Sequence, residues 1–484
     1  MTPQHKIIKF ALAAALLTAL LFMPSCNDIT RDTVYIPEGP ETQPKDGGHD
    51  EKWLFDMDAV PMITISVTRE NWEQFLKNCD EDINNDIYVP AAFDFDKNGE
   101  HYHRDSVGLR LKGNTSRRRP EGVTGEPHNP YNPDWHHCHL GIRFNEYATG
   151  SRFCKTDRIV LKWFKDDGTY CREVYAYDLM QRFGVWVEPL VSYTRVTLNV
   201  EGDAKPAYLG VFAMIERVHK GYIKTRKRNG QLPDTICNLW KCSWGADLSN
   251  MNTADMGIET PNFHPLYDLK TNKENLNAAK QQLASFINNM VPLKSGSAEL
   301  KAYLEQNMDI DQFLRALAVN CIIGSWDDYW RSANNYYCMF DSRGKFYYIP
   351  FDLDNVLGTS QGINSGTQDL LNWGSRGGDR MLVRKVLSIK EYENQYVAYL
   401  HELADTEKDL FAPEKSMMRI KRWQNMIAAY IDNDTGEDTQ FKDEPAWWAE
   451  CGFYRLLSGN DKGGKQGDAN FFKTRVANLP QLQQ

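Results

Sequence analysis

The sequence has no excess of basic residues and lacks the spacing of common metal motifs. Lys and Arg total 56 against 65 Asp and Glu, which gives a formal net charge of −9. Because proteins that bind nucleic acids normally carry a basic surface, this composition argues against nucleic acid as a partner. No CxxC motif occurs, and no second ligand pair stands at zinc-site spacing from His136-His137-Cys138-His139. We therefore do not expect zinc at that cluster.

A long apolar run lies at the N-terminus. Lys6 and Lys9 stand before residues 10–23, which are apolar except for Thr18. The run is long for the core of a signal peptide and short for a spanning helix. Met23-Pro24-Ser25-Cys26 follows and resembles a bacterial lipobox, although plain cleavage nearby or an uncleaved anchor are alternatives. We predict a lipoprotein signal peptide over residues 1–26, with Cys26 as the lipidated first residue of an exported protein. It would touch the membrane through its lipid only, on the periplasmic or cell-surface face.

Nine cysteines remain after Cys26, so at least one thiol is unpaired. Cys321 and Cys338 lie among apolar and aromatic residues. We expect most of the nine to be small buried hydrophobic residues, although an exported chain can form disulfides.

The remaining chain divides by its patterns into four parts, within the roughly two to four lobes or domains that its length allows. Residues 27–52 are polar and read as a flexible tether. Residues 53–270 alternate in the manner of strands, and form a β-rich N-terminal lobe. Residues 271–459 show helical spacing, beginning with 276–290, and form a mainly helical C-terminal lobe. We expect a long functional loop or lid over 358–379 and a loose tail over 460–484. The fold class predicted is α+β.

The stretch from Gly324 to Gly358 carries the densest chemistry. Residues 336–340 and 345–351 favour strands, and Asp341-Ser342-Arg343-Gly344 favours a turn between them. Such a hairpin would bring the Asp327 and Asn335 end close to the Asp352 and Asp354 end. Carboxylate and amide oxygens gathered there suit Mg²⁺, and phosphoryl transfer needs that arrangement. The alternative is that these acidic residues only form turns and helix caps.

Two further elements suggest an anion site, each with a plain structural alternative. Gly113, Asn114, Thr115 and Ser116 form a turn ahead of three arginines, which would suit either a phosphate nest or a hairpin turn with a solvated basic face. Lys241 with Glu216 would make a cation–carboxylate pair that positions phosphates, or they are a surface lysine and a strand-end charge.

The order of lobes and acidic residues is similar to that of protein kinases, without the usual His-Arg-Asp or Asp-Phe-Gly letters. The chain resembles the CotH family, the spore coat protein H-like atypical kinases, from about residue 60 to 430. The resemblance rests on Lys112-Gly113-Asn114-Thr115-Ser116, Tyr208-Leu209-Gly210-Val211-Phe212 leading to Glu216, Leu239-Trp240-Lys241, Gly324-Ser325-Trp326-Asp327 with Asn334-Asn335-Tyr336-Tyr337, and Ile349-Pro350-Phe351-Asp352-Leu353-Asp354.

The resemblance implies an atypical kinase fold that phosphorylates Ser or Thr of an exported protein, using ATP and Mg²⁺ or Mn²⁺. Asp327 would be the catalytic base, with Asp328 as the alternative, because neither reproduces the usual spacing to the metal-binding Asn. Asn335, Asp352 and Asp354 would hold metal. The phosphates would lie against Lys241, supported by Glu216, and under the turn of Gly113, Asn114 and Ser116.

A second function class also fits the sequence. A pseudokinase-like surface lipoprotein would bind a protein or glycan partner through exposed tryptophans. Because ATP is scarce outside the cytoplasm, either nucleotide is supplied there, the donor differs, or the fold serves only to bind. The candidates are Trp326, Trp330, Trp373, Trp423, Trp447 and Trp448, unless they pack in the core. The combination of Asp327, Asn335 and Asp352 favours the enzyme. Metal-dependent hydrolysis is less favoured, because no dinuclear His and Asp ligand set occurs.

Overall fold

The structure is a computed structural model that describes residues 46–249, 252–260, 262–359, 364–374, 380–431, 452–458 and 470–482. All of these belong to one compact unit, residues 43–484. The predicted signal peptide, Cys26 and most of the tether lie outside the described residues, as do Trp447 and Trp448. No helix within the described ranges has the length and apolar character needed to cross a membrane.

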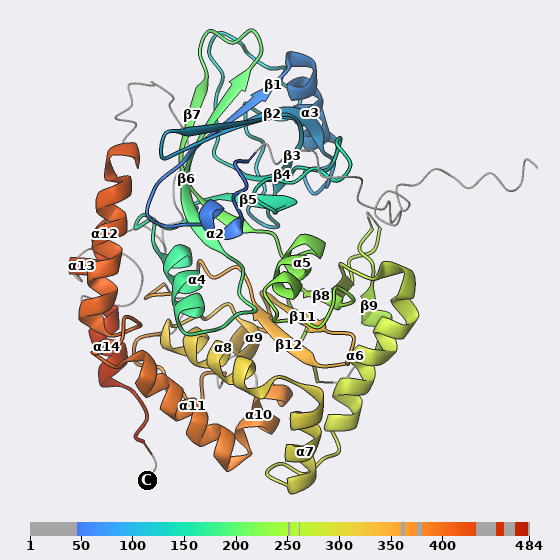
Figure 1. The fold of residues 1–484 in the computed structure, drawn as a ribbon, viewed down its shortest axis with the longest axis vertical. Helices are drawn as coiled ribbons and strands as arrows, with labels where there is room; N and C mark the ends of the chain where they lie inside the picture. Colours follow the sequence, from blue (N-terminus) through green and yellow to red (C-terminus); the bar gives the residue numbers. More distant parts are fainter. Residues whose placement is uncertain are drawn as a thin grey trace, which may run out of the picture. The chain divides into compact units, whose positions relative to one another are not determined.

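Seven strands close into a barrel, seen in the upper part of Figure 1. They are β1 (Met62–Val67), β2 (Val89–Lys97), β3 (Glu100–Lys112), β4 (His139–Arg143), β5 (Arg158–Trp163), β6 (Val191–Val200) and β7 (Ala207–Glu216), in the order β1-β2-β3-β4-β5-β7-β6. The strand periods predicted from alternation are largely confirmed, since Ile63, Ile65, Leu109 and Leu111 point into a buried interior. The closure is new. β1 pairs with β2 on one side and with β6, in parallel, on the other, so the sheet has no free edge.

A second sheet lies below the barrel and contains the predicted hairpin. Its strands are β8 (Asn238–Cys242), β9 (Met256–Gly257), β10 (Tyr267–Leu269), β11 (Tyr336–Phe340) and β12 (Phe346–Pro350), in the order β12-β11-β8-β10-β9. Three of them precede residue 270 and two follow it, so this sheet joins segments from both sides of the predicted boundary. The reason is the pairing of β8 with β11, in which Lys241 lies opposite Tyr337.

Helices surround the second sheet and flank the barrel. They are α2 (Glu51–Leu54), α3 (Arg69–Glu81), α4 (Arg172–Arg182), α5 (Lys220–Arg228), α6 (Leu276–Met290), α7 (Ala298–Asn307), α8 (Ile310–Ile322), α9 (Tyr329–Ser332), α10 (Met381–Leu387), α11 (Lys390–Leu403), α12 (Pro413–Ile431), α13 (Arg455–Ser458) and α14 (Phe471–Ala477), with 3-10 turns at Thr253–Asp255 and Lys273–Asn275. The helical character predicted from residue 276 onward is confirmed. The tail is not uniformly loose, because α14 buries Phe472 in the core.

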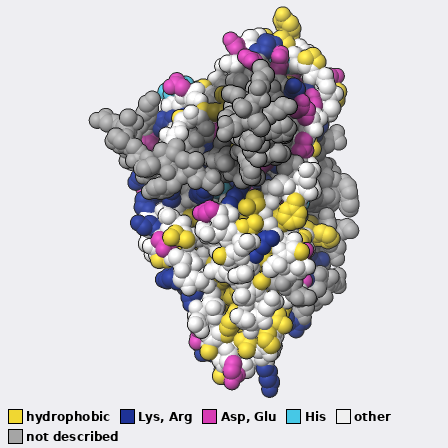
Figure 2. Space-filling view, turned by 90° about the vertical axis from the view of Figure 1, so that its right-hand side faces the viewer, with side chains coloured by type: hydrophobic (Ala, Val, Ile, Leu, Met, Phe, Trp, Pro, Cys, Tyr) yellow, Lys and Arg dark blue, Asp and Glu magenta, His cyan; other side chains and the backbone are white. Residues whose placement is uncertain are grey.

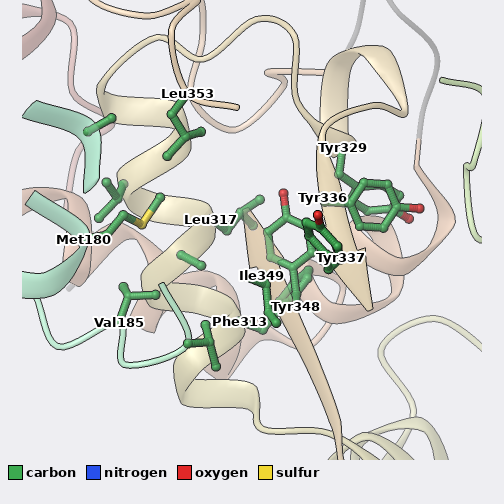
Figure 3. Packing of buried hydrophobic residues seen from close by; sticks show 14 of the residues in the cluster. Met180, Val185, Phe313, Leu317, Tyr329, Tyr336, Tyr337, Tyr348, Ile349 and Leu353 are labelled. Atoms are coloured by element: carbon green, nitrogen blue, oxygen red, sulfur yellow. The ribbon is translucent and has the colours of Figure 1, made fainter. Parts of the chain in front are cut away.

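The core beneath the hairpin is formed by α8 packed between α4 and β12 (Figure 3). Phe313 and Leu317 of α8 lie between Met180 of α4 and Ile349 of β12, and Tyr348 packs beside them. This rigid base fixes the position of the strand ends that carry the acidic residues.

Four of the tryptophans predicted as surface candidates belong to this core. Trp326, Trp330, Trp373 and Trp423 are at most 8% exposed, so they cannot contact a partner from the surface. Trp373 also donates a hydrogen bond to the carbonyl of Ser325, 2.8 Å away, which packs the described part of the predicted lid against the loop before Asp327.

The eight cysteines of the described ranges are buried thiols without disulfides, as expected for small hydrophobic residues. Cys242 and Cys338, on neighbouring strands, place their sulfur atoms 3.7 Å apart.

In the view turned toward the right-hand side of Figure 1, hydrophobic side chains reach the surface mainly in the lower half (Figure 2).

Candidate active site

The hairpin brings the two predicted ends together. Tyr336 lies opposite Pro350, and the amide of Phe351 donates a hydrogen bond to the carbonyl of Asn335 at 3.0 Å. The amide of Asp352 donates to the hydroxyl oxygen of Tyr177, on α4, at 3.2 Å. Asn335 and Asp352 both have positive φ angles, 54° and 60°, in the left-handed region, which Asn and Asp adopt more readily than other non-glycine residues.

Asp327 is held by two amide side chains. Asn334 donates to Oδ1 at 3.1 Å and Asn335 donates to Oδ2 at 3.0 Å. Burial raises the pKa of Asp327, the two amide hydrogen bonds oppose this, and the nearby Asp352 carboxylate raises it further. The side chain is half-buried, so it can still meet a ligand.

Asp328 has a different task. Its carboxylate caps α9 by accepting a hydrogen bond from the amide of Arg331 at 2.9 Å, and the residue is only 2% exposed. Burial raises its pKa to about 7. Of the two predicted bases, Asp327 is therefore the one whose carboxylate lies beside Asn335 and Asp352.

A lysine that the sequence reasoning missed lies at the centre of the acidic residues. Lys162, on β5, contacts Asp352 directly, Asp354 at 3.1 Å and Glu173, in the first turn of α4, at 2.9 Å. Its side chain is 12% exposed, whereas those of Asp352 and Asp354 are 39% and 31% exposed. Burial would lower the pKa of Lys162, but the three carboxylates raise it well above its ordinary value, so the amine is charged.

The ammonium in turn shapes its acidic neighbours. Burial would raise the pKa of Asp352, yet Lys162 outweighs it and the pKa lies below its ordinary value. Burial raises the pKa of Asp354 to about 6 despite the same ammonium. The sequence offered one signal for this pair. Lys162 lies in a β-prone run and is followed closely by a helix that carries Glu173 in its first turn.

Glu216 and Lys241 do not form the predicted pair. Glu216 accepts two hydrogen bonds from Arg226 of α5, at 2.7 and 2.8 Å, and one from the amide of Leu190. It is 3% exposed, so its role is a buried structural ion pair. Lys241 lies instead on β8, where burial, Lys270 and Arg217 lower its pKa to about 8.

The predicted nest after β3 is only partly present. Gly113 has a φ of 113°, and a Cβ there would lie 2.6 Å from Ser116 Oγ, so the turn requires glycine. Asn114 is exposed and accepts a hydrogen bond from the amide of Arg117. However, Arg117 binds Asp86 and Arg119 binds Asp80, so these two guanidinium groups are already engaged in ion pairs.

A comparison with known protein families shows which family the chain belongs to. The sequence profile described as CotH kinase protein matches residues 132–455, which is more than half of the 484 residues. The chain belongs to the CotH kinase family. Gly113, Asn114 and Ser116 lie before the matched region, whereas Lys162, Asp327 and Asp352 lie within it.

Three fungal CotH proteins of Rhizopus delemar show weak similarity. Spore coat protein homolog 1 is 24% identical over 206 residues, covering 41% of this chain and 30% of that protein. Invasin CotH7 is 25% identical over 206 residues (41% and 31%), and invasin CotH3 is 22% identical over 263 residues (50% and 39%). The matches span less than half of each relative.

The CotH site has an all-oxygen set of candidate metal ligands. Within the described ranges, no three His, Cys, Asp or Glu side chains converge on one metal position. Asp352 and Asp354 share one cation, Lys162, and the amide oxygen of Asn335 accepts no hydrogen bond from a described residue. Mg²⁺ is usually bound by one or two carboxylates together with phosphate oxygens. The residues therefore fit Mg²⁺ or Mn²⁺ provided that the ligand supplies the remaining oxygens.

Proposed function

We propose that this CotH protein is a phosphotransferase that moves the γ-phosphoryl group of ATP to a Ser or Thr hydroxyl of an exported protein. The observation that carries the proposal is one arrangement of side chains. A half-buried Asp327, fixed by two amides, faces the pair Asp352 and Asp354, whose negative charge is balanced by Lys162.

Each group has a task that its surroundings favour. The raised pKa of Asp327 makes it a better acceptor for the hydroxyl proton of the substrate, and its amide contacts fix its orientation. Lys162, oriented by Glu173, would bind phosphate oxygens, in the manner of the lysine–glutamate pair of protein kinases. Asp352, Asp354 and the amide oxygen of Asn335 would hold Mg²⁺. When bound, the ion would neutralise charge on the transferred phosphoryl group.

The test compares the full-length protein with Asp327→Asn and Asp352→Asn. Radiolabelled ATP with Mg²⁺, Mn²⁺ or EDTA, and a generic Ser/Thr-rich protein acceptor, would report transfer as well as autophosphorylation. The matched control is Asp105→Asn, because the Asp105 side chain is 84% exposed on β3. We expect metal-dependent transfer in wild type and control and none in the two site variants, with unchanged melting temperatures. Undiminished transfer by both site variants would refute the assignment.

We further propose that the protein is exported and attached to a membrane through a lipid on Cys26. The support is the apolar run that ends in Met23-Pro24-Ser25-Cys26. Metabolic labelling with a palmitate analogue should mark wild type and not Cys26→Ser. Labelling of both would place the acylation elsewhere.

A further inference from the structure

A cavity of about 380 Å³ lies beside α9, the short helix that follows Asp327 and Asp328. Trp330 of α9 lines it, together with residues of the loop after α6, of the described part of the predicted lid, and of α10 and α11, which lie in the lower part of Figure 1. None of its lining residues comes from the barrel. Small-molecule sites usually enclose about 300–1,000 Å³, so this cavity is near the lower limit and suits one anchoring side chain.

The buried lining residues of the cavity are apolar, and the exposed ones are polar. Trp330 and Val383 are 4% and 1% exposed, and Leu371 is half-buried. Ser295 and Arg384 are exposed at its mouth. A bulky apolar side chain would therefore leave water inside the cavity, while the main chain that carries it would meet polar groups at the mouth.

The walls of the cavity are tied to α9 and to the loop before it. Arg380, which precedes α10, donates hydrogen bonds to the carbonyls of Tyr329 and Arg331, both at 3.1 Å. Trp373, in the predicted lid, donates to the carbonyl of Ser325 at 2.8 Å. A side chain held in the cavity is therefore fixed in position relative to the loop that carries the candidate base.

The cavity is close enough to Asp327 for one peptide segment to reach both. Trp330 follows Asp327 by three residues, and consecutive Cα atoms are 3.8 Å apart, so the two Cα atoms lie at most about 11 Å apart. An extended peptide covers this distance in about three to four residues. Binding energy from a remote side chain would then hold the reacting hydroxyl in place.

The residues around the mouth carry an excess of positive charge. Helix α10 contains Arg384 and Lys385 and no acidic residue, and Lys294 is exposed in the loop after α6. Glu393, an acidic residue that lines the cavity, pairs with Lys390 at 3.1 Å. Acidic residues next to the anchoring side chain would therefore be favoured by charge complementarity.

We propose that this cavity is the docking site for the acceptor protein. It binds a bulky apolar side chain flanked by acidic residues, about three to five positions from the hydroxyl that is phosphorylated. The inference rests on the proposed phosphotransferase function and adds the class of acceptor sequence to it. The donor nucleotide has its proposed contacts elsewhere, since Lys162 and Asp352 do not line the cavity.

The test is fluorescence anisotropy of labelled peptides with the full-length protein in EDTA, without nucleotide. Each peptide has one serine and, about three to five positions to either side of it, a leucine between two glutamates. Matched peptides carry alanine in place of the leucine. Ser295→Trp fills the mouth, Leu371→Asp places a charge inside, and Arg384→Glu reverses a charge at the mouth. The controls are Gln281→Trp and Lys421→Glu, at exposed positions of α6 and α12.

We expect the best leucine peptide to bind wild type and both controls at least about tenfold more tightly than its alanine match, as burial of one leucine side chain predicts. Ser295→Trp and Leu371→Asp should each remove this preference. Arg384→Glu should weaken binding of the leucine peptide about two- to fivefold, because the charge is exposed. A wild type without the preference, or a preference that survives in both cavity variants, would overturn the docking site. Undiminished binding by Arg384→Glu would overturn its acidic part.

Transfer kinetics distinguish a failure of the docking site from a failure of the phosphotransferase proposal. With ATP and Mg²⁺, Ser295→Trp should raise the KM for the leucine peptide at least about tenfold. Asp352→Asn should lose transfer and keep the leucine preference in the binding assay. Transfer without any leucine preference would overturn the docking site alone, whereas a leucine preference without transfer in wild type would overturn only the phosphotransferase.

Discussion

Replacing Lys162 by Met tests whether the site depends on its central cation. The substitution keeps most of the aliphatic stem and removes the ammonium that Asp352, Asp354 and Glu173 share. Three carboxylates would then face one another without a cation. A fully buried ion pair that loses one partner costs about 3–5 kcal/mol.

The cost at this site should be smaller, because part of the cluster remains hydrated. Asp352 and Asp354 are 39% and 31% exposed, so water can solvate them and one carboxyl group can take up a proton. We expect Lys162→Met to lower the free energy of unfolding by about 1–3 kcal/mol and to abolish detectable binding of ATP with Mg²⁺. Urea denaturation measures the first quantity and calorimetric titration the second.

The matched control is Lys301→Met. Lys301 also contacts two carboxylates, Glu391 at 2.5 Å and Glu305 at 3.6 Å, but on the exposed surface of α7. Its removal should leave ATP binding unchanged and stability nearly so, because exposed ion pairs contribute little. A double-mutant cycle with Glu173→Gln should give a coupling of about 0.5–3 kcal/mol with Lys162→Met. Wild-type stability and ATP binding in Lys162→Met would refute the reasoning.

The remaining predictions concern groups away from the reacting atoms. Asp328→Asn keeps the helix cap but removes a carboxyl group whose folded-state pKa, about 7, lies above its unfolded value. As the pH rises from 4 to 7 the unfolded chain loses this proton first, so wild type should lose up to about 4 kcal/mol of stability relative to the variant, measured by denaturation at each pH. Arg226→Met leaves Glu216 buried and unpaired, so it should cost about 3–5 kcal/mol of unfolding free energy without changing ATP affinity at a permissive temperature. Unaltered stability would contradict the structural role. The eight described cysteines, including Cys242 and Cys338, should react with a thiol reagent only after denaturation, and fast labelling of any of them in the native protein would contradict their burial.

Local patterns were enough to predict the hairpin. The turn formers Asp341 and Gly344 stand between two β-prone runs, and the strands begin and end within a residue of the expected positions. A two-stranded unit of this kind depends on neighbours in the sequence, so its geometry follows from residue type and spacing. The juxtaposition of Asn335 and Asp352 follows from the hairpin register alone.

Pairs that depend on distant parts of the chain were not predicted. Lys162 precedes Asp352 by 190 residues, and no periodicity links them. The sequence left open whether Lys241 pairs with Glu216 or whether the two are a surface lysine and a strand-end charge. The fold pairs Glu216 with Arg226 and places Lys241 beside other cations.

The sequence by itself determined the helices after residue 276, the strands of the barrel, and the hairpin that brings Asn335 close to Asp352. These follow from periodicity, turn chemistry and side-chain type, which act over a few residues. Only the tertiary structure decided that the barrel closes through β1 and β6, that β8 joins the hairpin sheet, and that Lys162 rather than Lys241 meets the acidic pair. The physical reason is that strand pairing and ion pairing across long loops are selected by the packing of the whole core, which no local pattern encodes.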